Sequence, residues 1–261
     1  MKLGVIGLGL IGGSMALGLR ERHDVAGFDV SPATRAGAAR RGVRTVDRPE
    51  DLFPADAVVV ATPLASVVPT LDSLATRSAE AVLVEVGSLK SAVAAFAERA
   101  PGGMRIVGLH PMAGSTATGF DAADPGLFRG RPFLVVPTAR TDDRAAALAG
   151  DLARDLGGMV TVCSAAVHDR AVAVVSALPL AAAVALLRVA RSAAPLDVDA
   201  VAGPGFRDAT RLAGTSADLA LALLKAPGLR EHLASLRSAI AEVESALGDD
   251  AALRALFDRR A

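Results

Sequence analysis

A histidine and a serine that follow two neighbouring predicted strands have the types and positions needed for chemistry. His110 comes directly after an apolar run at 105–109, and Ser88 follows another at 81–86. Imidazole titrates near neutral pH, so His110 could take the proton of a substrate hydroxyl group while hydride leaves the adjoining carbon. The Ser88 hydroxyl could orient that ring and bind the same oxygen. Position alone equally allows a helix-capping Ser88 and a structural His110 bonded to the backbone.

A glycine-rich turn near the start of the chain has the spacing of a dinucleotide-binding loop. Gly7, Gly9 and Gly12 follow the first predicted strand and open the first predicted helix, with Leu10 and Ile11 between the last two glycines. The first glycine permits a tight turn, the second lets the backbone approach a pyrophosphate, and the third allows close helix packing. The helix N-terminus then offers free N–H groups to the phosphates. The turn therefore predicts a bound dinucleotide.

An acidic residue at the end of the second predicted strand indicates which dinucleotide binds. Asp29 lies 20 residues after Gly9, where a carboxylate binds the ribose hydroxyl groups of NAD and repels the extra phosphate of NADP. Arg35 is near in sequence but lies well inside the next predicted helix. Thr62 and Pro63 follow the third main strand and could border a ribose of the same cofactor. The expected cofactor is NAD.

The order of the predicted elements is typical of an α/β protein with a parallel sheet and crossover helices. The predicted strands are 2–6, 24–28, 57–61, 81–86, 105–109, 133–137 and 159–163. The predicted helices between them are 12–22, 32–41, 64–76, 90–99 and 142–156. After residue 163 the strand signal stops, and long Ala/Leu-rich helices follow. We therefore expect a Rossmann-type domain at 1–163 and an all-α domain at 164–261, which is apolar enough to form a homodimer.

Composition excludes several other classes of protein. The formal net charge is zero, so neither nucleic acid nor an anionic membrane is an expected partner. Residues 171–187 carry no charge, but they are short for a membrane span and contain Pro179, which favours a buried helix. The single cysteine, Cys163, fits a reducing cytoplasm. No cluster of histidine, cysteine and carboxylates has metal-ligand spacing.

The residues around His110 resemble the signature of prephenate and arogenate dehydrogenases. The string GLHPMAGS at 108–115, followed by Gly119 and by Leu-Phe at 127–128, is highly specific for that family. Other matching segments occur in the same order, namely GLIGGS at 9–14, ATP at 61–63, VGSLK at 86–90, HD at 168–169 and GFRDATR at 205–211. The resemblance covers about residues 2–215. It implies a Rossmann domain followed by a helical dimerisation domain.

The resemblance also implies roles for the matched residues. His110 would bond the 4-hydroxyl group of a cyclohexadienyl acid and accept its proton, with Ser88 assisting. Arg211 would pair with a substrate carboxylate, because its guanidinium forms two parallel hydrogen bonds to such a group. Arg207 would share this task or face solvent, and an ion pair with Asp208 is the alternative for Arg211. The loop residues Ser115 and Thr116 complete the expected substrate site.

The implied activity is an NAD-dependent oxidation and decarboxylation of prephenate to 4-hydroxyphenylpyruvate in tyrosine biosynthesis. Departures from the family pattern leave the substrate open. Residues 176–180 read SALPL where many relatives have SHLPH, and Glu85 replaces a usual aspartate. The uncharged run Thr-Ala-Thr at 116–118 resembles arogenate-using members. Arogenate is therefore the alternative substrate, and 4-amino-4-deoxyprephenate is a third.

Two further classes remain as alternatives. β-Hydroxyacid dehydrogenases share this domain order but use a lysine of the helical domain, where this chain has only Lys225. A non-catalytic NAD-sensing module would keep the glycine turn and Asp29 without needing Ser88, His110 and Arg211. The dipeptide His168-Asp169 at the start of the helical part is interpreted as a feature that packs the two domains together.

Overall fold

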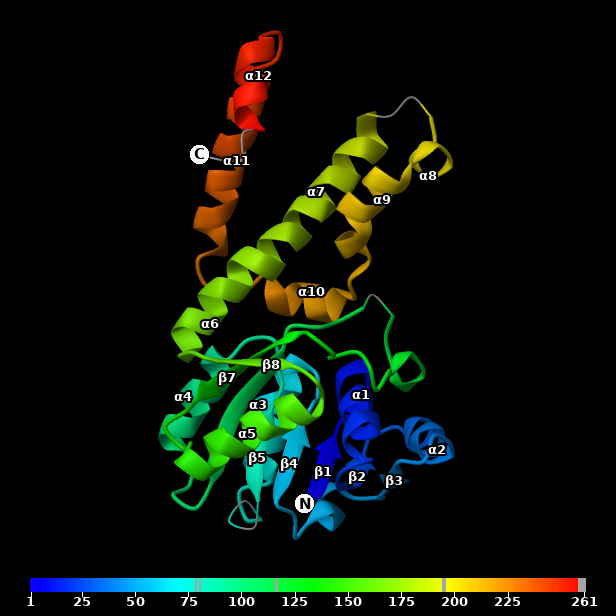
Figure 1. Cartoon of the computed structure of the whole chain (residues 1–261), viewed down its shortest axis with the longest axis vertical. Coiled ribbons are helices and arrows are strands. Elements are labelled where there is room, and N and C mark those ends of the chain that lie inside the picture. Colours follow the sequence, from blue (N-terminus) through cyan, green and yellow to red (C-terminus); the bar gives the residue numbers. More distant parts are fainter. Residues whose placement is uncertain (78, 80, 116, 194–195, 258–261) are drawn as a thin grey trace.

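The computed structural model describes residues 1–77, 79, 81–115, 117–193 and 196–257. Within them, the N-terminal part forms an eight-stranded sheet in the order β3-β2-β1-β4-β5-β6-β7-β8 (Figure 1). The strands are β1 Lys2–Ile6, β2 Asp24–Phe28, β3 Arg44–Thr45, β4 Ala57–Val60, β5 Val82–Glu85, β6 Arg105–Pro111, β7 Pro132–Pro137 and β8 Met159–Val162. All seven predicted strands are present, and the two-residue β3 was not predicted.

Helices cover both faces of this sheet. They are α1 Leu10–Leu19, α2 Pro32–Arg40, α3 Leu64–Ser73, α4 Ser91–Arg99 and α5 Asp143–Asp155, with short 3-10 helices η1 Pro49–Leu52 and η3 Phe120–Ala122. One core cluster joins the sheet to α1 and α5 through residues such as Met15 and Leu152. A second cluster joins the opposite face to α3 and α4 through Val67 and Phe96. Because both faces are covered, β4 and β5 are buried along their whole length.

The Rossmann-type parallel sheet is present as predicted, and it continues into an antiparallel strand that the prediction did not include. Strands β1 to β6 run parallel, whereas β7 pairs antiparallel with β6, and β8 runs parallel to β7. Between β6 and β7 the described residues contain only η3, so the chain has no long crossover helix of the kind a parallel pair requires. The strand β6 also extends two residues beyond its predicted end. His110 therefore lies inside β6, opposite Leu134, rather than in a loop after the strand.

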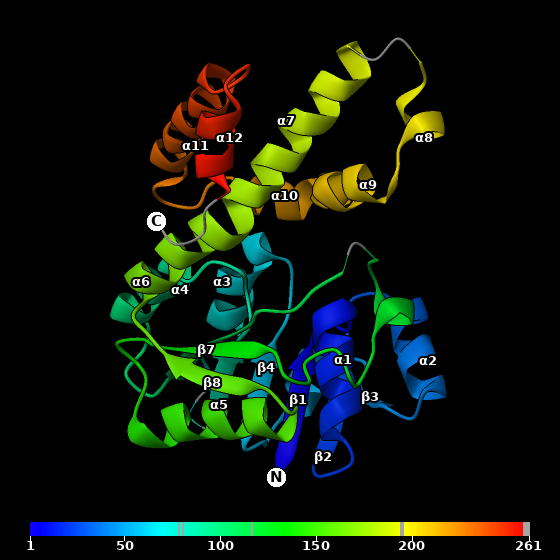
Figure 2. The same cartoon turned by 45° about the horizontal axis from the view of Figure 1, so that its top comes forward.

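The C-terminal part is helical and lies against the carboxyl-end edge of the sheet (Figures 1 and 2). Its described elements are α6 Ala165–Val172, η4 Ala173–Ala177, α7 Leu178–Ala193, α8 Val198–Val201, α9 Pro204–Thr210, η5 Arg211–Gly214, α10 Ala217–Leu223, α11 Leu229–Ser245 and α12 Asp250–Leu256. Contacts of α6 with α4 and of α10 with α3 join it to the N-terminal part.

The helix α6–η4–α7 is continuous from Ala165 to Ala193 and contains a π-helical turn at η4. This turn ends two residues before Pro179, whose ring nitrogen has no hydrogen to donate to the carbonyl group four residues earlier. A π-helical turn is a common way to absorb such a missing bond. The irregular turn therefore has a local cause in the sequence.

This long helix is not buried by the chain itself. By length and composition it could cross a membrane, with a mean hydropathy of 2.2, yet only 28% of its most apolar window is buried. Exposed apolar side chains continue along α7 at Val184, Leu186 and Val189, and along α11 at Ile240 and Val243. The prediction of a buried helix is therefore wrong for a single chain, because sequence periodicity shows an apolar face but not what covers it.

The turn between β1 and α1 gives a direct test of the packing. A Cβ atom added at Gly12 would lie 1.9 Å from the Gly7 carbonyl oxygen, whereas one added at Gly9 would meet no atom within 4 Å. We expect Gly12→Ala to lower the free energy of unfolding by about 1–3 kcal/mol, as overpacking does. The matched Gly9→Ala should cost about 0.5 kcal/mol, the difference between glycine and alanine at a helix N-cap. Urea unfolding of both variants measures this, and equal losses would contradict the packing described.

Candidate active site

The glycine turn predicted from the sequence is formed between β1 and α1. Gly7 has φ +89°, and a Cβ there would lie 2.6 Å from the carbonyl oxygen of Ala61, so only glycine fits. Gly9 is the N-cap of α1 and provides no capping side chain, while Leu10 and Ile11 form the half-buried first turn. The open space at Gly9 and the uncapped helix N-terminus suit an approaching phosphate group.

The carboxylate of Asp29 is held beside this turn. Its Oδ2 accepts a hydrogen bond from the Leu8 backbone N–H at 2.9 Å, and its Oδ1 accepts one from the Ser31 N–H at 2.9 Å. Arg35 reaches back from α2 and donates to the Asp29 carbonyl oxygen at 2.7 Å, with its guanidinium 5.8 Å from the centre of the Phe28 ring. The end of β2 thus carries both a carboxylate and a nearby cation.

Two further predicted cofactor residues follow β4. Pro63 is exposed and is the N-cap of α3, and Thr62 precedes it. The Oγ1 atom of Thr62 is buried and has no hydrogen-bond partner among the described residues. A buried polar atom without a partner is uncommon in folded proteins. Together with the glycine turn and Asp29, this hydroxyl group fits a bound dinucleotide.

The side chain of His110 is the end of a hydrogen-bonded chain of three residues. Its Nδ1 lies 2.8 Å from Nε2 of His168, and Nδ1 of His168 lies 2.7 Å from Oδ1 of Asp169. The two rings have centroids 5.0 Å apart and are tilted by 53°. His168 and Asp169 are fully buried, whereas His110 is partly exposed. The helical part therefore contributes directly to the position of the predicted catalytic residue.

Asp169 is anchored at the N-terminus of α4. Its carboxylate accepts hydrogen bonds from the backbone N–H groups of Lys90, at 2.8 Å, and Ser91, at 2.9 Å, and from the Ser91 hydroxyl group. Burial alone would raise the pKa of Asp169, but the hydrogen bonds from His168 and Ser91 outweigh it and lower that pKa to about 2. Asp169 thus caps α4 from a distant part of the chain and stays ionised.

A buried ion pair lies next to the hydrogen-bonded residues His110, His168 and Asp169. Lys90 Nζ is 2.7 Å from Oε1 of Glu85, and both side chains are almost completely buried. The other carboxylate oxygen of Glu85 accepts the Gly87 N–H at 2.9 Å, and Lys90 Nζ also donates to the Glu85 carbonyl oxygen at 3.2 Å. Burial raises the pKa of Glu85 and lowers the pKa of Lys90, while the charge of each partner opposes the shift of the other.

These neighbours keep the His110 ring neutral. Burial lowers the pKa of His110 well below its usual 6.5, and the charge of Lys90 lowers it further, against a smaller opposing effect of Asp169. A neutral imidazole has an unprotonated nitrogen and can accept a proton. In the described residues, His110 Nε2 makes no hydrogen bond. The geometry therefore presents a general base at the carboxyl-end edge of the sheet.

The remaining predicted residues from the N-terminal part are placed as follows. Ser88 is half-buried in the turn between β5 and α4, and the His110 ring is bonded to His168 rather than to Ser88. Ser115 is exposed, and its Oγ accepts the Ala117 N–H at 3.1 Å. Thr116 lies outside the described residues. The substrate roles of Ser88 and Ser115 stay predictions.

The two candidate arginines of the helical part differ in their bonding. Arg207 donates to the carbonyl oxygens of Ala202, at 3.2 Å, and Asp199, at 3.4 Å, and so holds the connection between α8 and α9. Arg211 is exposed at the start of η5 and has no ion pair or side-chain hydrogen bond with any described residue, Asp208 included. Its guanidinium is therefore available to a substrate, whereas that of Arg207 is engaged.

Sequence reasoning missed four residues of this site. His168 and Asp169 were interpreted as a packing feature, Glu85 was noted only as a departure from the family pattern, and Lys90 was given no role. A signal was available, because two charges lie in or beside a strand that is otherwise apolar, and such charges need partners when buried. The sequence could not show that a helix 79 residues further on would supply Asp169.

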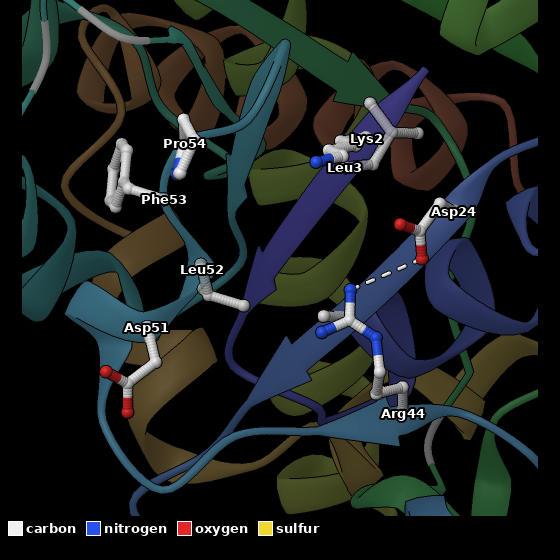
Figure 3. Close-up of a pocket in the computed structure, with 9 residues that line it drawn as sticks. Lys2, Leu3, Asp24, Arg44, Asp51, Leu52, Phe53 and Pro54 are labelled. Atoms are coloured by element: carbon white, nitrogen blue, oxygen red, sulfur yellow. Dashed lines mark hydrogen bonds and ion pairs between the residues drawn. The ribbon is translucent and has the colours of Figure 1, made fainter.

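A cavity of about 170 Å³ lies elsewhere, at the amino ends of the first strands. Figure 3 shows its lining, which includes Lys2, Asp24, Arg44 and Asp51, with the Arg44–Asp24 ion pair at 3.3 Å across it. Ligands of open parallel sheets bind beyond the carboxyl ends of the strands. This cavity is at the other edge and contains none of the residues predicted to bind cofactor or substrate. Among the described residues, no group of histidine, cysteine and carboxylates could hold a metal ion.

The fold and the site define a two-domain nucleotide-binding protein, and comparison with known families gives its membership. Residues 15–162 match the nucleotide-binding domain of prephenate dehydrogenase, and residues 164–251 match the dimerization domain of the same family. The chain therefore belongs to the prephenate dehydrogenase family, as its motifs predict.

Individual relatives agree with this membership. The prephenate dehydrogenase of Bacillus subtilis is 33% identical over an alignment of 223 residues that covers 80% of this chain and 60% of that protein. The cyclohexadienyl dehydrogenase of Zymomonas mobilis is 31% identical over 261 residues, covering 92% and 88% of the two chains. The chain thus spans about 60% of the length of the Bacillus relative.

Solved structures show the same two-domain fold. The arogenate dehydrogenase of Synechocystis is 31% identical, with a TM-score of 0.80 and coverage of 98% of this chain and 96% of that one. The prephenate dehydrogenase from A. aeolicus, in complex with hydroxyphenyl propionate and NAD+, is 25% identical, with a TM-score of 0.87 and coverage of 97% and 94%. A 3-hydroxyisobutyrate dehydrogenase of Mycobacterium tuberculosis, 19% identical with a TM-score of 0.55 and coverage of 89% and 93%, shares the fold alone.

The buried ion pair generates a prediction about stability. Lys90→Met leaves the Glu85 carboxylate buried without its partner, which should lower the free energy of unfolding by about 3–5 kcal/mol. The double variant Glu85→Leu/Lys90→Met should recover most of that loss, since neither charge then remains in the core. Urea unfolding at neutral pH measures both. Lys225→Met, at an exposed lysine, is the matched control, and a loss no larger than that of the control would contradict the buried pair.

Proposed function

We propose that this chain is an NAD-dependent prephenate dehydrogenase that converts prephenate to 4-hydroxyphenylpyruvate in tyrosine biosynthesis. The observation that carries the proposal is the His110 imidazole, kept neutral and bonded through Nδ1 to the His168–Asp169 pair, in a chain of this family. The same observation argues against a module that only senses NAD, because such a module needs no base. A β-hydroxyacid dehydrogenase would use a lysine of the helical domain as its acid and base. In this chain the lysine of that domain, Lys225, is exposed in the turn after α10, which argues against this class of enzyme.

The cofactor assignment follows from the first two strands. Gly9 and the N-terminus of α1 would hold the pyrophosphate, Asp29 would bind the adenosine ribose, and Thr62 would face the same molecule. When bound, NAD supplies the acceptor for the hydride that leaves C4 of the substrate. Asp29 favours NAD over NADP because a second anion beside its carboxylate would be repelled. The domain that holds the cofactor is proposed to be residues 1–163.

His110 performs the proton transfer of the reaction. Its unprotonated Nε2 would accept the proton of the substrate 4-hydroxyl group, and Ser88 would bind the same oxygen. The ketone formed at C4 then draws electrons from the ring, so carbon dioxide leaves from C1 and the ring becomes aromatic. The chain itself contributes the base and its orientation, and aromatisation makes the reaction irreversible.

Substrate carboxylates require a cation, and Arg211 is proposed to provide it. Its guanidinium has no other partner among the described residues, and α10, the next α-helix after η5, contacts α3 of the N-terminal domain. Arg207 is the lesser candidate because it already donates to two backbone carbonyl groups. Ser115 and Thr116 are proposed to line the same pocket from the loop after β6.

Arogenate is the second candidate substrate. It is favoured by the likeness to the Synechocystis arogenate dehydrogenase and by the absence of charge at 116–118. The two substrates differ only in a pyruvyl or an alanyl side chain, so the proposed roles of His110 and Arg211 apply to both.

The active assembly is proposed to be a homodimer through residues 164–261, in the cytoplasm. The match to a dimerization domain supports this, as do the exposed apolar side chains of α7 and α11. A patch of that extent on a monomer is normally covered by a partner. A second copy would cover the same face of both chains, as two-fold symmetry requires. No nucleic acid and no membrane are proposed as partners.

The proposed function is tested by turnover. Purified protein should reduce NAD faster than NADP with prephenate or arogenate, followed by the absorbance of the reduced nicotinamide. His110→Asn should lower kcat/KM at least about 100-fold, the effect of losing a general base, and leave the Kd for NAD unchanged. Ser73→Ala, at an exposed serine at the end of α3, is the control. An unchanged turnover in His110→Asn would remove this residue from the mechanism.

The pH dependence has a defined sign. The active form of His110 is neutral and is populated above its pKa, which burial and the charge of Lys90 hold well below 6.5, while Asp169 opposes them. We therefore expect kcat/KM to be level from pH 8 to 6.5 and to fall only at more acidic pH. The Glu85 carboxylate faces Lys90 and moderates its charge. A fall centred near pH 6.5 would contradict the lowered pKa.

Arg211 has its own test. Arg211→Ala should raise KM for the acid substrate by about tenfold or more, because a charge-assisted hydrogen bond of about 1.5–3 kcal/mol is lost. Arg211→Lys should recover only part of this, since a lysine cannot form the two parallel bonds. Arg207→Ala is the matched control, and an equal rise in KM for that variant would reassign the contact.

A further inference from the structure

The buried pair His168–Asp169 has a chemical consequence that neither residue shows in the sequence. Neutral imidazole exists in two tautomers, with the proton on Nδ1 or on Nε2, and only the nitrogen without a proton can act as a base. A residue that bonds one nitrogen of a catalytic histidine therefore decides which nitrogen reacts. In this chain, His110 is bonded on Nδ1 and free on Nε2 among the described residues.

The direction of each hydrogen bond between His110, His168 and Asp169 follows from Asp169, the last of the three residues. The Asp169 carboxylate accepts hydrogen bonds from two backbone N–H groups and from the Ser91 hydroxyl group. An ionised carboxylate has no hydrogen of its own to donate, so it is the acceptor in every bond that it makes. The bond between Asp169 and Nδ1 of His168 must therefore carry the hydrogen on the ring nitrogen. With its ring hydrogen placed on Nδ1 by this bond, His168 offers a bare Nε2, which can only accept.

The same logic then fixes the next ring. Because His168 Nε2 accepts, the hydrogen of the 2.8 Å contact belongs to Nδ1 of His110. We infer that His168, held by Asp169, is a positioning residue that locks His110 in the Nδ1–H tautomer and so directs its Nε2 toward the substrate hydroxyl group. The inference rests on the proposed function for its role in turnover, but the tautomer itself is a property of the protein without substrate.

The surroundings make this arrangement specific rather than incidental. His110 is held in β6 by pairing with Leu134, so the ring can turn only about its side-chain bonds, and the Nδ1 contact restrains that motion. Asp169 in turn is attached to the N-terminus of α4, next to the buried Glu85–Lys90 pair. When Nε2 gains the substrate proton, the Nδ1–H bond to His168 allows the ionised Asp169 to stabilise the new positive charge.

A role limited to packing would give different results from a positioning role. His168→Leu fills the space without hydrogen bonds, whereas His168→Gln can accept from His110 and donate to Asp169 with one amide group. We expect His168→Leu to lower kcat about 100-fold with the Kd for NAD unchanged, and His168→Gln to stay within about tenfold of the original protein. Equal losses in the two variants, or a loss explained by unfolding of both, would overturn the inference.

The tautomer can be measured without turnover. The chain has four histidines, so long-range ¹⁵N–¹H NMR spectra at pH 7.5 assign each ring, with His110→Asn identifying the signals of His110. We expect a protonated Nδ1 and a bare Nε2 for His110, and a mixture of tautomers in His168→Leu. A protonated Nε2 in the unmodified protein would overturn the inference even in an active enzyme. An inactive protein with the expected tautomer would instead contradict only the proposed function.

Discussion

The burial of one carboxylate organises the site. Asp169 can lie in the interior only because backbone N–H groups at the start of α4, a hydroxyl group and an imidazole satisfy it. The backbone N–H groups and the hydroxyl group come from the N-terminal domain, while Asp169 and the imidazole of His168 belong to α6, the first helix of the C-terminal domain. The requirement to satisfy the charge therefore joins the two domains at one point. His168, its neighbour in sequence, is brought against His110 by the same contact.

The buried ion pair of Glu85 and Lys90 affects the protonation of His110. Lys90 is paired with Glu85 but also lowers the pKa of His110, so the structure keeps a histidine neutral in a region that contains two carboxylates. A buried pair of this kind contributes little net stability, because desolvation offsets most of the attraction. Its effect on the protonation of His110 is the clearer consequence.

The helical domain presents a different balance. Its small core cluster joins η4 to the start of α11, and long apolar faces of α7 and α11 stay exposed in the single chain. Such a surface is costly in water, at roughly 25 cal/mol for each Å² of apolar area. Covering these apolar faces with a second copy of the chain would be favourable, which agrees with the match of this part to the dimerization domain of the family. The N-terminal domain needs no such partner, since both faces of its sheet are covered by its own helices.

The sequence by itself determined the local features. Gly7 and Gly12 follow from a turn that leaves no room for a side chain, Asp29 follows from its position at the end of β2, and His110 follows from a highly specific motif. These depend on residues close in the chain. Only the tertiary structure decided that β7 is antiparallel, that α7 is exposed, and that His168 and Asp169 complete the site. Each of these depends on contacts between distant segments, such as the 79 residues from Lys90 to Asp169, which no local pattern encodes.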